Sequence, residues 1–315
     1  MKLISPFMIS LVVSPLSVMA EGKFDPYQLN GGLVAGGAGR DFVVLAADTR
    51  LTGSSGFEIL QRQHTSSRLW SMIPSTLAKT MQSEMRKYSE RSAGRIEAEM
   101  DDYKEETLML PSAPSKECPI WIGSVGCSTD CEELKRVCQQ LVRQNLCTGE
   151  LAVSQSDLSS SLAIWLGQIL YGRRGFPYYA FCVLAGCDDQ GGHVYGYDAI
   201  GSYERLAVSV SGQGRNILQA ILDRRFHSAP APTDDSDGDN DREGRDGLLI
   251  RRVTKTSTQV TETAEETCRI LIQAFRDVAK REASVGDSLV LLCWRYSNER
   301  IHPSITFASL PENRP

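Results

Sequence analysis

The stretch ILYGRRGFPYYAF, residues Ile169 to Phe181, decides the fold class of this chain. It ends an amphipathic segment at Gly172, passes through two arginines, a second glycine and a proline, and enters an aromatic-rich run. A glycine followed by a proline typically ends a helix, and an apolar aromatic run favours a strand. The stretch therefore predicts a helix, a turn and a buried strand. It contains no nucleophile paired with a base.

The segments on either side of this junction alternate between strand-like and helix-like patterns. The predicted elements, in order, are a strand at Phe42–Asp48, a short strand at 119–128, two helices ending near Tyr171, strands at 178–187 and 193–198, a strand and helix over 201–226, a long helix after Thr263 and a strand at Ser288–Trp294. The order is strands, two helices, strands, two helices, strands. It predicts an α+β fold with sheets at the centre and paired helices outside them.

Three segments stand apart from this pattern. Residues 1–23 form an apolar leader ending in Val18-Met19-Ala20, which is consistent with a secretory signal or with a pro-segment before a domain that starts near Phe24. Residues 71–117 are highly charged, with apolar residues at helical spacing, and predict a helical insertion outside the main core; a disordered loop is the alternative. Residues 228–247 carry no core-forming side chains and predict an acidic disordered loop.

Composition and motifs exclude several classes of function. The 315 residues carry a net charge of -5, so nothing in the charge balance favours nucleic acid. The nine cysteines form no CxxC pair, which argues against zinc and for buried reduced thiols. The glycines around Ala38 precede a strand and not a helix, so no dinucleotide loop is predicted. No metal, no cofactor and no membrane segment is expected.

The assembled pattern resembles the beta subunits of the 20S proteasome, and within them a non-catalytic member. The stretches that carry the resemblance are FDPYQLNGG (Phe24–Gly32), AADTRL (Ala46–Leu51), the junction Ile169–Phe181, YDAIGSYER (Tyr197–Arg205) and LQAILD (Leu218–Asp223). This resemblance implies the N-terminal-nucleophile hydrolase fold, a four-layer αββα sandwich of two antiparallel sheets flanked by helix pairs. It implies one domain over residues 24–315 and a pro-segment over 1–23.

The resemblance also allows the family's catalytic positions to be checked one by one. Active members expose an N-terminal threonine, whose hydroxyl attacks the substrate and whose amine is the base. That slot is occupied here by Gly32, and the lysine slot is assigned to Ser66. The supporting aspartate and two serines align with Glu282, Val285 and Gln213, so that Asp48 is the one family residue retained. No catalytic residue is therefore predicted.

The resemblance implies an architectural role in place of catalysis. The expected partners are other beta subunits in a heptameric ring, the alpha-ring subunits and the opposing beta ring, in the cytoplasm and nucleus. Protein substrates of the ATP- and ubiquitin-dependent pathway would pass through the chamber that the ring encloses. Two alternatives stay open: an active threonine-type peptidase subunit of the same fold, with Thr52 or Ser54 as a downstream nucleophile, and a secreted binding protein, suggested by the leader alone.

Overall fold

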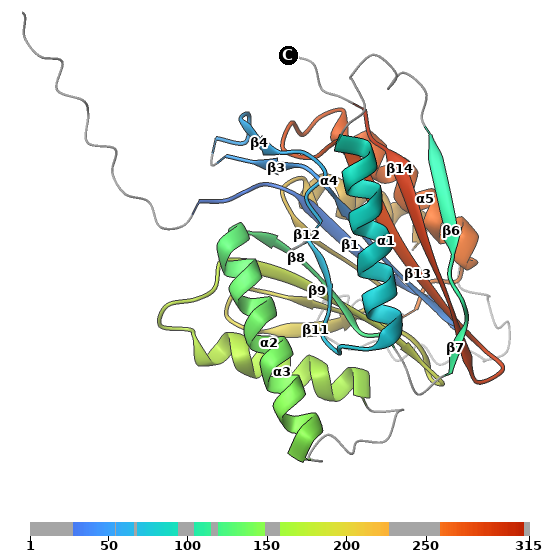
Figure 1. Cartoon of the computed structure of the whole chain (residues 1–315). Helices are drawn as coiled ribbons and strands as arrows, with labels where there is room; N and C mark the ends of the chain where they lie inside the picture. The colour runs from blue at the N-terminus through green and yellow to red at the C-terminus, as the bar shows by residue number, and fades with distance from the viewer. Residues whose placement is uncertain are drawn as a thin grey trace, which may run out of the picture.

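The computed structural model describes residues 28–53, 55–65, 68–93, 104–114, 119–148, 158–226 and 259–311 (Figure 1). The leader at 1–23 and the acidic segment at 228–247 lie outside these residues, so the predictions made for them stay predictions. None of the described helices is long and apolar enough to cross a membrane.

Two antiparallel sheets form the centre of the described structure. The larger sheet has seven strands. Six of them follow the order β12 (Val208–Gly212), β1 (Leu33–Ala38), β2 (Phe42–Asp48), β13 (Ser288–Ser297), β14 (Arg300–Ser309) and β6 (Glu105–Met109). The seventh, β7 (Ala113–Pro114), also pairs with β14. The second sheet has five strands, in the order β11 (Tyr203–Leu206), β10 (Gly191–Tyr197), β9 (Ala180–Asp188), β8 (Trp121–Gly126) and β5 (Leu69–Ser71). A small hairpin joins β3 (Leu51–Thr52) to β4 (Ile59–Gln61).

Strand β2 shows why the larger sheet lies between two apolar layers. All seven of its residues are buried, and successive side chains of a strand point to opposite faces of a sheet. Phe42, Val44 and Ala46 belong to one core cluster, whereas Val43, Leu45 and Ala47 belong to the other. The uninterrupted apolar run therefore reflects burial on both faces, as the sequence predicted.

Five helices cover these sheets (Figure 1). Helices α4 (Arg215–Phe226) and α5 (Ala264–Ala279) pack on the larger sheet, while α2 (Ser128–Thr148) and α3 (Leu158–Gly172) pack on the smaller one. Helix α5 begins where its capping residues predicted, because the Thr263 hydroxyl accepts a hydrogen bond of 3.3 Å from the amide of Glu266. The mixed α+β class predicted from the sequence is confirmed.

The junction Ile169–Phe181 also has the structure that its sequence predicted. Helix α3 ends at Gly172, a turn follows, and β9 begins at Ala180. The guanidinium of Arg174 stacks 4.4 Å from the ring centre of Tyr171, and that of Arg173 lies 5.2 Å from that of Tyr178. The two arginines thus pack on aromatic rings.

The prediction that residues 71–117 form an insertion outside the main core is wrong. Helix α1 (Thr76–Ala93) buries Leu77, Met81 and Met85 in the same core cluster as the two sheets. Tyr88 of α1 stacks on Phe307 of β14, with ring centres 3.8 Å apart. Strands β6 and β7 extend the larger sheet beyond β14. The charged side chains occupy the opposite face of the helix, so a strongly charged composition did not prevent burial of the apolar stripe.

Candidate functional site

Gly32 lies immediately before strand β1 and has a backbone φ of +90°. Its carbonyl oxygen accepts a hydrogen bond of 2.9 Å from the amide of Gln213. A Cβ atom added at this position would overlap the guanidinium group of Arg68. Residue 32 must therefore be glycine for two reasons: its φ lies in the region that side chains disfavour, and the space in front of it is already filled.

Arg68 fills that space and is 3% exposed. Its guanidinium donates hydrogen bonds to three backbone carbonyls: that of Gly31 at 2.8 Å, that of Asn30 at 3.2 Å and that of Arg50 at 2.8 Å. These bonds fix the chain just before the nucleophile slot. The space in front of Gly32 thus contains a cation whose two terminal nitrogens hold the backbone, while its Nε has no hydrogen-bond partner among the described residues.

Asp48, at the end of β2, links the start of β1 to the loop before β13. Its carboxylate accepts hydrogen bonds from the amide of Leu33 at 2.8 Å and from the amide of Gly286 at 3.2 Å. Complete burial raises the pKa of Asp48 from 3.8 to about 6, and the positive charge of Arg68 opposes this shift. Because both oxygens bind backbone amides, Asp48 has a clear structural role here.

The remaining aligned positions also converge on this region. Residues 282–286 approach Gly31, since a Cβ added at Gly31 would lie 3.1 Å from the Cβ of Ser284. Glu282 accepts a hydrogen bond of 2.8 Å from the Ser284 hydroxyl, whereas Val285 is fully buried and apolar. The loop that would support a nucleophile is present, but these residues supply no hydroxyl aimed at the slot.

The sequence reasoning missed Arg68. Ser66, to which the lysine slot was assigned, lies outside the described residues. The cation that the structure places against Gly32 is Arg68, two residues further on and directly before strand β5. A basic residue immediately preceding a buried strand was the signal available in the sequence.

Of the two downstream candidates predicted from the sequence, Ser54 lies outside the described residues and Thr52 lies within them. Its hydroxyl oxygen is buried beside Gly31 and has no hydrogen-bond partner among the described residues. Thr52 is the last residue of β3 and is joined to Leu51 by a peptide bond, so it carries no free amine to act as base. His64 is near this strand, and burial lowers its pKa to about 4. A hollow of about 690 Å³ adjoins β3 and is lined by polar and charged side chains, among them His64, Glu132 and Arg136.

The described residues contain no cluster that would hold a metal ion and no disulfide. No group of three or more histidine, cysteine, aspartate or glutamate side chains is arranged to hold a metal ion within those residues. Seven cysteines of the described residues are free thiols, and six of these seven are buried. Burial raises the pKa of Cys131 and of Cys138 to about 12, which keeps these thiols protonated.

Comparison with known proteins gives this arrangement a class. The family model for proteasome subunits matches residues 119–235. Proteasome subunit beta type-1 of Danio rerio is 28% identical over 207 residues, 65% of this chain and 65% of that protein. The type-1 subunit of Arabidopsis thaliana is 29% identical over 273 residues, 86% of this chain and 90% of its own length. A probable proteasome subunit beta type-6 of Schizosaccharomyces pombe is 27% identical over 276 residues, 87% of this chain and 92% of that protein.

Residues 119–235 therefore match the proteasome-subunit family, and the chain is similar over most of its length to proteasome beta subunits. The particular subunits that it matches are named type-1 and type-6. The resemblance predicted from the sequence is confirmed. The match spans 65% of the length of the Danio rerio and Carassius auratus relatives.

Proposed function

We propose that this chain is a catalytically silent beta-type subunit of a proteasome core particle. The observation that carries the proposal is the pair formed by Gly32 and Arg68. A hydrolase of this class needs a hydroxyl and a free amine on one N-terminal residue. Gly32 has no side chain, and the guanidinium that faces it is bonded to three carbonyls.

The arrangement of secondary structure supports the finer fold assignment that goes with this function. Helices α4 and α5 lie on one sheet and α2 and α3 on the other, with an apolar core between the sheets. The fold is accordingly a four-layer αββα sandwich of the N-terminal-nucleophile hydrolase type. Residues 24–315 form its single domain, and residues 1–23 are a leader or pro-segment.

The role that follows is architectural. The subunit occupies one position in a heptameric beta ring, contacts neighbouring beta subunits, the alpha ring and the opposing beta ring, and helps to enclose the chamber through which protein substrates pass. Its place of action is the cytoplasm and nucleus, in ATP- and ubiquitin-dependent degradation. The alternative, an active threonine-type peptidase, would have to use a residue such as Thr52, which is fully buried at the end of β3.

Two measurements test this proposal. The purified chain, free of other beta subunits, is expected to show no turnover of fluorogenic peptides, and turnover that survives removal of contaminating proteases would refute catalytic silence. In native electrophoresis of a cell extract, the chain is expected to migrate with a particle many times its own mass. A monomeric or secreted species alone would refute the architectural role.

A further inference from the structure

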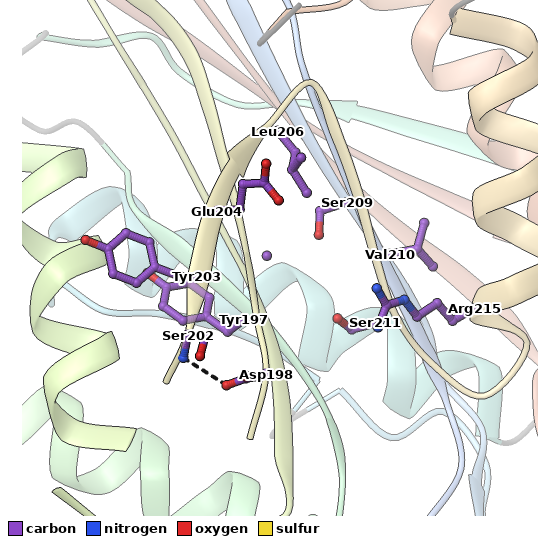
Figure 2. A pocket seen from close by; sticks show the side chains of 11 residues that line it. Tyr197, Asp198, Ser202, Tyr203, Glu204, Leu206, Ser209, Val210, Ser211 and Arg215 are labelled. Atoms are coloured by element: carbon purple, nitrogen blue, oxygen red, sulfur yellow. Dashed lines mark hydrogen bonds between the residues drawn. The ribbon is translucent and has the colours of Figure 1, made fainter. Parts of the chain in front are cut away.

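A hollow of about 320 Å³ lies where one edge of each sheet meets the other (Figure 2). Strand β11 is the end strand of the smaller sheet, and β12 is the end strand of the larger one. A single residue, Ala207, connects them. Figure 2 shows Glu204 and Leu206 on one arm of this connection and Ser209, Val210 and Ser211 on the other, with open space between the arms.

The backbone of β12 presents unpaired groups along its outer edge. In an antiparallel pair, alternate residues turn both their N–H and C=O toward the partner strand. The bonds from Ala38 N to Ala207 O and from Gln213 N to Gly32 O show that odd-numbered residues of β12 face β1. Val208 and Val210 therefore direct their backbone groups away from β1, and no other described strand pairs with β12.

Strand β11 has the same property on its own side. The amide of Asp198 donates to the carbonyl of Ser202, so the even-numbered residues of β11 face β10. Tyr203 and Arg205 consequently turn their backbone groups outward, where no described strand pairs with β11. An unpaired strand edge is a template on which another polypeptide can add a strand. Two such edges here border one hollow.

Side chains in the hollow add a charged anchor. Arg215, the first residue of α4, lines the hollow, and no hydrogen bond or ion pair of its side chain occurs among the described residues. The hydroxyls of Ser209 and Ser211 are likewise without partners in that part of the chain and line the same space. A guanidinium matches the geometry of a carboxylate with two parallel hydrogen bonds. The anchor therefore favours a carboxylate next to β12.

A second, apolar hollow continues past Arg215. It has a volume of about 210 Å³, shares Ser211 and Arg215 with the first, and is lined by Leu29 and Phe181. A peptide running along β12 would thus pass a free strand edge, a cation and then a space that suits an apolar side chain. Successive side chains of an extended segment point to opposite sides, which fits such an alternation.

We propose that the hollow between β11 and β12 binds a short extended segment of a neighbouring subunit, which pairs with the outer edge of β12 and presents a carboxylate to Arg215. The inference rests on the proposed function for the source of that segment. The binding chemistry itself can be measured on the full chain alone, so the two claims can fail separately.

The first experiment uses fluorescence anisotropy of the full chain with the fluorescein-labelled probe Val-Thr-Val-Thr-Val, bearing a free C-terminal carboxylate. We expect saturable binding, weakened about tenfold when the probe is amidated. Arg215→Gln should abolish this difference between acid and amide, whereas Arg225→Gln, an exposed arginine of the same helix outside the hollow, should preserve it. N-methylation of one alternate set of probe residues should abolish binding, and methylation of the other set should not. Absence of binding at about 1 mM, or insensitivity to N-methylation, would overturn the proposal.

The second experiment identifies the source of the segment in the assembled particle. A photocrosslinking amino acid placed at Tyr203, which is 42% exposed at the rim of the hollow, is expected to crosslink to a peptide of another proteasome-type subunit. A crosslink to residues 1–27 of the same chain would overturn the proposed source. Probe binding without any particle would leave the peptide site standing and contradict the architectural function.

Discussion

Replacing Arg68 with alanine tests whether this buried cation holds the N-terminal entry of the fold in place. The substitution removes a donor from three carbonyls: those of Gly31 and Arg50 lose Arg68, while that of Asn30 keeps its bond of 3.1 Å from the amide of Thr52. It also removes the positive charge beside the buried carboxylate of Asp48. The carbonyls of Gly31 and Arg50 are buried and have Arg68 as their donor, and the carboxylate of Asp48 loses the favourable charge of Arg68 while keeping its two backbone amides.

The expected magnitude follows from the number of groups left unpaired. A buried acceptor that loses its partner costs about 1–3 kcal/mol, and breaking a buried charged contact costs about 3–5 kcal/mol. Because water can enter the cavity and satisfy some of these groups, we expect a loss below the sum of these costs, about 3–5 kcal/mol in the free energy of unfolding.

Urea unfolding of the wild type and Arg68→Ala measures this loss directly, provided that the slope of the transition is unchanged. The matched control is Arg62→Ala, since the Arg62 side chain is 41% exposed and contacts Asp287 at 3.3 Å. Asp287 keeps its bond to Arg50 in that variant, so the expected change is about 0–1 kcal/mol. A loss below about 1 kcal/mol for Arg68→Ala would refute the reasoning.

Three further predictions concern the same framework. Gly32→Ala should destabilise the chain by about 2–4 kcal/mol, because the added Cβ overlaps the Arg68 guanidinium and φ is +90°. The control Gly175→Ala should change stability by less than about 0.5 kcal/mol, because nothing lies within 4 Å of the added Cβ. Equal effects of the two substitutions in thermal unfolding would contradict this prediction. The pKa of Asp48 is raised from 3.8 to about 6, so the folded state binds its proton more tightly, and the resulting stability is present below pH 4 and lost as pH rises through 6. Stability measured from pH 4 to 7 should therefore contain a decline of about 3 kcal/mol that Asp48→Asn lacks, and parallel pH profiles would count against it. Tyr88→Ala should lower stability by about 1–3 kcal/mol through loss of the stack on Phe307; unchanged stability and unchanged hydrogen-exchange protection of α1 would show that the insertion does not belong to the core.

The sequence alone predicted those elements that are determined by their own residues and immediate neighbours. Phe42–Asp48 reads as a strand buried on both faces because the six residues before Asp48 are all apolar and suit either face. Thr263 marks the start of α5 because a hydroxyl followed by a glutamate satisfies the first free amides of a helix. Neither inference needs knowledge of distant residues.

The features that sequence reasoning missed depend on contacts between distant segments. The carbonyls bound by Arg68 lie 18 to 38 positions away in the chain, so nothing in its immediate neighbours indicates its role. Helix α1 was placed outside the core because charges dominate its sequence. Its Leu77, Met81 and Met85 nevertheless line up on one face, and that stripe alone was sufficient for burial against the sheets.

The central claim is that this chain has no N-terminal nucleophile, and the mature N-terminus tests it most directly. Mass spectrometry of the intact chain, purified from the cells that express it, would identify the first residue. The account predicts a mature chain whose first residue is not threonine, serine or cysteine. Position 32, the expected place of the nucleophile, is then still occupied by Gly32, which has no side chain. A mature chain that begins at Thr52, or at any other residue bearing a hydroxyl or thiol, would supply a nucleophile and its base together and would contradict the account.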